Sequence, residues 1–261
     1  MKIDEDSADA IHRLWDELAD FDAAQGEAAR RCLLARLCAL TDSQNATWVG
    51  AVRLGEPEPT DPIKGWRARV IRQLHPSRTF ERIDKELTDQ IEAGWVDETV
   101  VRNVALAGQY RALRLVDLTS PEWFEGDFYR TYYLDIGCRD AIWAGVPLNE
   151  DAECYVGLRR DLDHPPFGTA ERDVVVYALR GLRWFHRQQM LREGLLVASR
   201  PLAPAEQRVL KHLLQGRSEK KIAALLELSH HTVHDYVKSL FRKFGVSSRS
   251  ALMALWLGHT P

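Results

Sequence analysis

The sequence of 261 residues lacks any run of roughly 18 consecutive apolar residues, the length that a membrane-spanning helix needs. Its first residues, Met1 to Asp6, are mostly polar and acidic, and they lack the apolar core of a secretory signal. Apolar residues still make up 45% of the chain, which is too many for a disordered protein. We therefore expect a folded, cytoplasmic protein with no part in a membrane.

Cysteine is scarce as well. The four cysteines, Cys32, Cys38, Cys138 and Cys154, form no CxxC pair, the spacing on which zinc ribbons and many redox centres depend. All four lie in apolar stretches, so we interpret them as reduced thiols of the protein core. The sequence thus predicts no disulfide framework.

The chain as a whole has little net charge, −3, but its charges are unevenly distributed. From Arg200 to Pro261 there are ten basic and four acidic residues, a formal charge of +6, whereas the preceding residues carry −9. This asymmetry is typical of a basic nucleic-acid module joined to an acidic partner domain.

Hydrophobic periodicity predicts the elements of the first part of the chain. We expect helices over residues 8–21, 27–40, 77–93, 121–133 and 170–192, and strands over 46–52, 66–74, 110–118, 140–148 and 153–160. Ser77, Ser120 and Thr169 are the expected helix caps. Five strands with helices around them predict an α+β domain, in which helices flank an antiparallel sheet.

The order of these elements resembles that of the GAF/PAS class of sensor domains. The stretch Arg159 to Arg180, a strand followed by Pro-Phe and a long helix, is similar to the closing segment of such domains. The resemblance covers residues 28–192 and implies a sensor with an unidentified ligand or none. Gly194 and Pro201 interrupt the helical pattern, which divides the chain into a sensor domain (1–192), a linker (193–203) and a carboxy-terminal domain (204–261).

Four helices are expected in the carboxy-terminal domain, which makes it an all-α helix-turn-helix unit. The first covers 204–214, the second begins at Ser218, the third follows Ser229 and ends at Phe244, and the fourth starts near Ser248. Gly245 is the expected stop of the third helix.

The third helix has two distinct faces. One is an apolar stripe of Val233, Val237, Leu240 and Phe244. Beside it runs a polar edge, composed of His231, His234, Asp235, Lys238 and Arg242. A helix that packs by one face and presents polar groups on another suits the major groove of duplex DNA.

The stretch Leu202 to Leu252 resembles the DNA-binding domain of LuxR-type regulators. The matching residues are Leu202, Glu206, Val209, Leu210, Gly216, Lys220, Ile222, Ala223, Leu226, Ser229, Thr232, Val233, Lys243, Gly245, Val246, Ser248 and Arg249. The resemblance implies a transcription regulator that binds double-stranded DNA as a homodimer. It also implies that the third helix enters the major groove and that the fourth contributes to the dimer contact.

The resemblance carries specific roles to positions of this chain. The base-facing positions fall on His234, Asp235 and Lys238, and the backbone-facing positions on Lys220, Thr232 and Lys243. Lysine can neutralise phosphate, and Lys238 can reach guanine O6 and N7. Asp235 departs from the family's usual uncharged residue and is either a specificity element, accepting from cytosine N4, or a tolerated surface charge.

Three other features of this module and the sensor have simpler interpretations. His231 and His234 share a face, but no third ligand stands near them, so we predict no metal site. We expect the tryptophans Trp48, Trp66, Trp123, Trp143 and Trp184 to be core rather than pocket residues. We interpret the acidic pairs Asp84/Glu86 and Asp97/Glu98 as solvated faces.

Two alternatives stay open. Pro121-Glu122-Trp123, Tyr129 and Asp140 resemble the arrangement of an acyl-homoserine-lactone pocket, but they lie close to the end of the domain. The basic module could instead bind protein while the first domain acts on or senses a small molecule. No pair of nucleophile and base and no cofactor motif emerges, so we expect neither an enzyme nor a bound cofactor.

Overall fold

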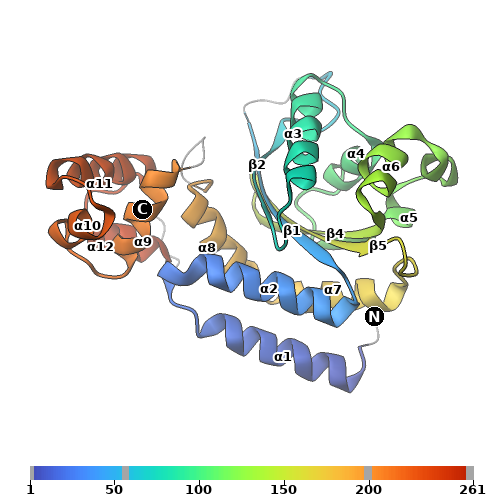
Figure 1. The fold of residues 1–261 in the computed structure, drawn as a ribbon, viewed down its shortest axis with the longest axis horizontal. Helices are drawn as coiled ribbons and strands as arrows, with labels where there is room; N and C mark the ends of the chain where they lie inside the picture. Colours follow the sequence, from blue (N-terminus) through green and yellow to red (C-terminus); the bar gives the residue numbers. More distant parts are fainter. Residues whose placement is uncertain (1–2, 55–58, 197–201, 257–261) are drawn as a thin grey trace.

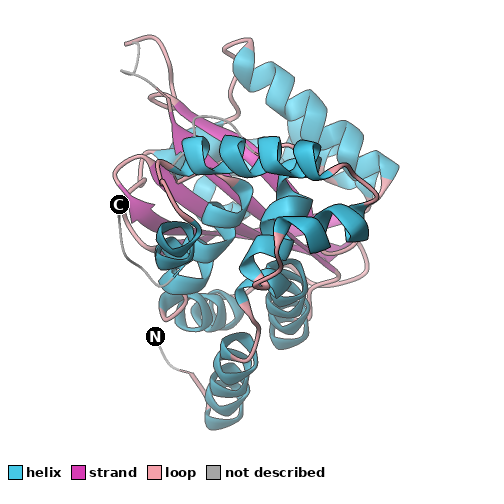
Figure 2. Ribbon diagram, turned by 90° about the vertical axis from the view of Figure 1, so that its left-hand side faces the viewer, coloured by secondary structure: helices cyan, strands magenta, loops and turns pink. Residues whose placement is uncertain are grey.

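The computed structural model describes residues 3–54, 59–196 and 202–256. They form an antiparallel sheet with helices on both faces, followed by a group of four helices at one end of the molecule (Figure 1). Figure 2 shows the sheet lying between its two layers of helices. Among the described residues, no helix combines the length and the apolar character that a membrane crossing requires.

The sheet has five strands, each antiparallel to its neighbours, in the order β2-β1-β5-β4-β3. The bounds are β1 Asn45–Arg53, β2 Trp66–Gln73, β3 Arg111–Arg114, β4 Cys138–Asn149 and β5 Ala152–Asp161. The expected number of strands and the antiparallel α+β arrangement are confirmed. Strands β4 and β5 are buried on both faces, because helices cover the two sides of the sheet.

One face of the sheet carries the main hydrophobic core. The helices of this side are α1 Glu5–Ala19, α2 Gly26–Thr41, α7 Thr169–Arg180 and α8 Arg183–Glu193, with the short 3-10 helix η1 Ala23–Gln25 between the first two (Figure 1). In α1, Ile11, Leu14 and Leu18 form a buried stripe. All four cysteines are free thiols, and three of them are buried.

The opposite face is covered by shorter helices. They are α3 Arg78–Glu92, α4 Glu98–Val104, α5 Leu115–Leu118 and α6 Asp127–Tyr132, with the 3-10 helices η2 Pro121–Glu125 and η3 Leu134–Ile136 (Figure 1). Ser77 caps α3 as expected, since its hydroxyl accepts a hydrogen bond from the Phe80 N–H at 3.2 Å.

Strand β1 contributes to both sides. Trp48 points toward α8, where its indole N–H donates to His186 Nδ1 at 3.1 Å. Gly50 lies so close to α8 and the residues after it that a Cβ there would be 2.8 Å from Met190 Sδ and 2.7 Å from Leu195 Cδ1. Val49 and Ala51, the alternate residues, face the other side. A single strand thus separates the two layers with no spare volume at Gly50.

The expected continuous helix over 170–192 is wrong. It is divided into α7 and α8 at Gly181 and Leu182, and Leu182 has non-helical backbone angles. Gly181 packs directly on the indole of Trp15, and Leu182 is fully buried. The break therefore lets both halves follow the sheet. The first residue of α7 is Thr169, and Gly168 takes the cap position that we had assigned to Thr169.

Two further expectations are corrected on the other face. The strand predicted over 110–118 ends at Arg114, because the Asp117 carboxylate accepts from the Arg114 N–H and turns the chain into α5. The helix predicted over 121–133 is interrupted at Gly126, which has extended backbone angles. Helix α4, which begins after Asp97, was not among the predicted elements.

A buried ion network lies where α8 meets the helix α9 Pro204–Leu214. Glu193 is 2% exposed, and its carboxylate lies 3.3 Å from Arg30 Nη1 and 2.8 Å from Arg72 Nη2. Its Oε2 also accepts from the Gln207 side chain at 2.9 Å. Burial lowers the pKa of Arg30 to about 10, although Glu193 opposes that shift. The division at a linker over 193–203 stays a prediction, and residues 197–201 lie outside the described residues.

Candidate nucleic-acid interface and sensor cavity

The last four helices are each started or ended by local chemistry. They are α9, α10 Glu219–Leu226, α11 His230–Phe244 and α12 Arg249–Trp256. Ser218 caps α10, and Ser229 caps α11 by accepting from the Thr232 N–H at 3.0 Å. Glu227 adopts a left-handed conformation (φ 55°) that makes the turn between these two helices. Gly245 (φ 65°) ends α11, as predicted.

The apolar face of α11 forms the centre of this module. Val233, Val237, Leu240 and Phe244 are all buried, and they pack with residues of the other three helices. Phe244 also contacts the ring of Trp256, with centroids 5.6 Å apart. The predicted stripe is confirmed, and it fixes which side of α11 faces outward.

The polar edge of α11 lies on the outward side. His231, Asp235, Lys238 and Arg242 are exposed, while Thr232 and His234 are half-buried. Within the edge, His231 Nε2 lies 3.6 Å from Asp235 Oδ2. Lys220, in the first turn of α10, is also exposed. Figure 1 shows α11 at the end of the molecule remote from the sheet. The structure therefore leaves the predicted base-facing residues accessible.

Lys243 is placed differently from the other predicted contacts. Its ammonium lies 2.6 Å from Oε2 of Glu206, a buried carboxylate that also accepts from the Ser239 hydroxyl and the Ala203 N–H. Burial opposes ionisation of Glu206, but Lys243 and these hydrogen bonds outweigh it and lower its pKa. Lys243 thus ties α11 to the start of α9, and its contact with a DNA phosphate stays a prediction.

Two side-chain hydrogen bonds and an apolar contact join the described residues of the module to α8. Arg187 donates to the backbone carbonyl of Leu255 in α12 at 3.1 Å, and Gln207 donates to Glu193. The buried residues of α12, Leu252, Leu255 and Trp256, share a hydrophobic cluster with Leu191 of α8. The apolar side of the fourth helix is therefore covered within this chain, and the predicted dimer contact has to use its remaining surface.

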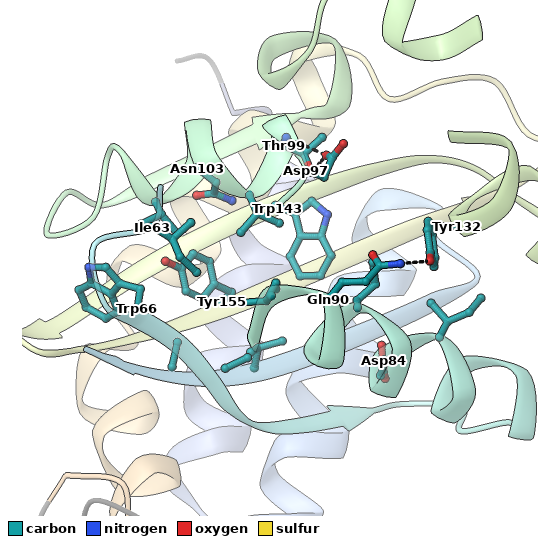
Figure 3. A pocket seen from close by; sticks show the side chains of 18 of the residues that line it. Ile63, Trp66, Asp84, Gln90, Asp97, Thr99, Asn103, Tyr132, Trp143 and Tyr155 are labelled. Atoms are coloured by element: carbon teal, nitrogen blue, oxygen red, sulfur yellow. Dashed lines mark hydrogen bonds between the residues drawn. The ribbon is translucent and has the colours of Figure 1, made fainter. Parts of the chain in front are cut away.

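The part of the chain that forms the sheet contains a cavity of about 200 Å³ between the sheet and helices α3, α4 and α6. Figure 3 shows Trp66, Trp143 and Tyr155 lining it, with Ile63 nearby and Gln90 on α3 opposite. Gln90 donates to the Tyr132 hydroxyl at 2.7 Å. The wall is mostly apolar and aromatic with a few polar groups, which is the composition of small-molecule sites.

Two carboxylates border this cavity. Asp97 is buried, caps α4 through the Thr99 N–H, and accepts from the Trp123 indole N–H at 3.0 Å. Burial raises the pKa of Asp84, although Arg159 and a hydrogen bond from Gln73 oppose the shift. The interpretation of Asp97 as solvated is therefore wrong, whereas Asp84 is half-buried. An aspartate at the end of a loop is a common helix N-cap, so Asp97 could have predicted the start of α4.

A buried ion pair holds two of the residues that line the cavity. Arg111 of β3 makes two hydrogen bonds of 2.9 Å to the carboxylate of Glu153 in β5. It also donates to Asn103 at 2.7 Å and to the Tyr155 hydroxyl at 3.3 Å, and both of these residues line the cavity. Burial raises the pKa of Tyr155, so its hydroxyl stays neutral.

Of the five tryptophans predicted to be core residues, two line the cavity, and Trp184 is exposed, which corrects its assignment to the core. Trp66 and Trp143 line the cavity, which corrects their assignment as core residues alone. Trp48 is core as expected, Trp123 lies in an aromatic cluster with Tyr129, and Trp184 is 41% exposed. Trp123, Tyr129 and Asp140 do not line the cavity, and Asp140 accepts from the Phe167 and Ala141 N–H groups instead.

The helix-turn-helix geometry, with a buried stripe and an exposed polar edge on α11, defines a nucleic-acid-binding class of module. Residues 200–256 match the family of bacterial regulatory proteins described as the luxR family (GerE). The chain therefore carries a LuxR-family helix-turn-helix domain at its carboxy-terminal end. This family comprises regulatory proteins rather than enzymes.

A curated relative, the probable HTH-type transcriptional regulator GfsR of Streptomyces halstedii, is 37% identical over 68 residues. The match covers 26% of this chain and 28% of GfsR, so the chain matches little more than a quarter of that relative's length.

The fold as a whole is similar to solved structures of low sequence identity. SdiA in complex with octanoyl-rac-glycerol aligns with a TM-score of 0.50 and 12% identity, over 97% of this chain and 95% of that one. CepR2 of Burkholderia cenocepacia, an N-acylhomoserine lactone dependent LuxR family transcription factor, aligns with a TM-score of 0.47 and 18% identity, over 71% and 97%. The likeness to SdiA concerns the fold: a helix-flanked sheet followed by helix-turn-helix helices.

Proposed function

We propose that this protein is a sequence-specific DNA-binding transcription regulator whose first domain responds to a signal. The observation that carries the proposal is the geometry of α11, where four buried apolar residues oppose an exposed edge with His231, Asp235, Lys238 and Arg242. The module's formal charge of +6 supports attraction to phosphate. Access to the chromosome requires a cytoplasmic location.

In this proposal α11 enters the major groove and α10 braces it against the backbone. Lys238 donates to guanine O6 and N7, and His234 and Asp235 contact neighbouring bases. Lys220 and Thr232 bind phosphate oxygens and hold the helix in register without reading sequence. Two copies of the chain bind two half-sites related by a two-fold axis.

The experiment that tests this function is the binding of a fluorescent duplex library at rising salt. Association that falls steeply as salt rises is the expected result, because lysines release counterions from phosphates. A protein that fails to bind any duplex at low salt would refute the proposal and favour a protein-interaction module.

A second proposal concerns the sensor cavity, which we infer binds a small uncharged amphiphile. Its aromatic wall suits an apolar chain, and Gln90, Asn103 and the Tyr155 hydroxyl offer hydrogen bonds to a neutral polar group. The lining combines two carboxylates, Asp84 and Asp97, with two guanidinium groups, Arg67 and Arg159, so the wall carries no net charge that would favour an ionised ligand. The similarity in fold to SdiA in complex with octanoyl-rac-glycerol supports this class of ligand.

The probes for this second proposal are octanoyl-rac-glycerol, an acyl-homoserine lactone and octanoate. The first two should raise the melting temperature of the full chain, and octanoate should not. A rise with octanoate alone would contradict the assignment of an uncharged ligand.

A further inference from the structure

His234, near the middle of the polar edge, is held by a residue of the preceding helix. Its Nδ1 lies 3.0 Å from Oε2 of Glu219, the first residue of α10. Both side chains are partly exposed, at 43% for His234 and 29% for Glu219. The imidazole is therefore oriented by a partner on its inner side, while part of the ring remains open to a ligand.

The chemistry of this contact fixes the ring's proton. An ionised carboxylate has no hydrogen to donate, so it can only accept. The Nδ1 atom of His234 must therefore carry the proton and donate it to Glu219. In a neutral imidazole the other nitrogen, Nε2, then has a lone pair and acts as an acceptor.

The neighbouring charged groups leave this pairing intact. His230 Nε2 lies 4.0 Å from the same Glu219 oxygen, which is beyond hydrogen-bond distance. Asp235 is directed to His231, at 3.6 Å. Glu219 also occupies the first turn of α10, where the unpaired backbone N–H groups of the helix stabilise a negative charge.

From this geometry we propose that Glu219 is a positioning residue that makes His234 a hydrogen-bond acceptor toward the bases. The inference rests on the proposed DNA-binding function. In the major groove the hydrogen-bond donors are the amino groups of adenine N6 and cytosine N4, whereas guanine O6, guanine N7 and thymine O4 accept. His234 then selects adenine or cytosine at the base it faces and rejects guanine and thymine.

This assignment gives the polar edge a definite pattern. His234 and Asp235 both accept, and Lys238, one turn further along α11, donates. A half-site read by this edge therefore combines bases that present amino groups with a guanine beside them. With the opposite tautomer, His234 would donate and would favour guanine or thymine.

The first test is the tautomer itself, measured in the full chain at pH 8 by nitrogen-15 NMR of labelled histidine. His234→Ala identifies the His234 signals by their loss. The parent protein should show a protonated Nδ1 and an unprotonated Nε2, and Glu219→Ala should shift this ring toward the other tautomer. A protonated Nε2 in the parent would overturn the proposal.

The second test is selection from a randomised duplex library at pH 8 with the parent and three variants. His234→Ala identifies the base pair that His234 reads, by loss of preference there. Glu219→Ala should weaken the preference for adenine or cytosine at that same pair by about 3- to 10-fold, the value of one hydrogen bond. Glu227→Gln, which removes an equal charge just after the last residue of α10 and keeps the length of the side chain, should leave the preference unchanged.

The outcomes separate the two levels of the argument. If the parent enriches no sequence, the proposed DNA-binding function fails. If the parent enriches a sequence but Glu219→Ala retains the full preference, or His234→Ala changes no position, only the role of Glu219 fails.

Discussion

The carboxylate of Glu193, at the end of α8, accepts a hydrogen bond from the side-chain amide of Gln207 in α9. The same carboxylate faces Arg30 of α2 and Arg72 of β2. One buried acidic group thus connects the sheet, two of its helices and the first helix of the LuxR-family domain.

Glu193→Ala should lower the free energy of unfolding by roughly 3–5 kcal/mol, because Arg30 would be left buried without its carboxylate. Urea denaturation measures this change. The control is Glu27→Ala, where an exposed carboxylate lies 3.8 Å from Arg192, and the expected loss is about 1 kcal/mol or less. Equal losses of unfolding free energy in the two variants would mean that the buried network stabilises the fold no more than an exposed ion pair does.

His186 should make the fold sensitive to acid. Burial lowers its pKa from 6.5 to about 3, so the unfolded chain binds more protons between those two pH values. Stability from this group is therefore complete above pH 6.5 and is lost as the pH falls, by about 2–3 kcal/mol between pH 6 and pH 4.

The measurement is urea denaturation of the parent and of His186→Asn, whose side-chain oxygen can still accept from the Trp48 indole N–H. The difference between the two proteins should shrink on acidification. A constant difference across this range would contradict the assignment of a neutral, buried His186.

Lys238→Ala should remove sequence discrimination. An exposed lysine on the polar edge reads guanine in our proposal, so its loss should reduce the ratio of specific to random duplex binding roughly tenfold or more. Competition binding at fixed salt gives this ratio. A variant that discriminates as the parent does would show that the base-reading residues are assigned wrongly.

Lys220→Ala should act on all sequences alike. Because a phosphate contact carries no sequence information, binding should weaken uniformly, and the slope of log affinity against log salt should decrease by about one. Lys243→Ala is the second variant, because the predicted phosphate contact of that ammonium competes with its contact to Glu206. We expect Lys243→Ala to lower the free energy of unfolding, because Glu206 loses its partner, and to change the salt slope by less than Lys220→Ala does.

Ala51→Leu should fill part of the sensor cavity. Ala51 lines the cavity from β1, so a larger side chain there should abolish the melting-temperature rise with octanoyl-rac-glycerol at little cost in stability. Ala46→Leu, on the same strand but in the packed main core, should cost about 1–3 kcal/mol by overpacking. A ligand response that survives Ala51→Leu would place the binding site elsewhere.

The helix-turn-helix module was predictable in detail because its signals are local. Ser218 and Ser229 are caps, Gly245 is a stop, and the stripe from Val233 to Phe244 follows the helical period. Each signal lies within one or two turns of the residue that it affects, so no knowledge of tertiary contacts was needed.

The sheet and its helices were predictable only in the order of their elements. The break at Gly181 depends on Trp15, more than 160 residues earlier in the chain, and the burial of Asp97 depends on Trp123. Helical periodicity continues across Gly181, and an acidic residue in a loop looks solvated until its partner is known. The cavity has no sequence signature, because residues from the sheet and three helices meet only after folding.

Strand β1 has a mechanical consequence for this protein. Val49 lines the cavity on one side of the strand, and the next residue, Gly50, packs against Met190 and Leu195 on the other side. A bulky ligand that displaced Val49 would push β1 against these two side chains, because there is no free volume between them and Gly50. Such a ligand would therefore displace the carboxy-terminal end of α8, where Glu193 lies.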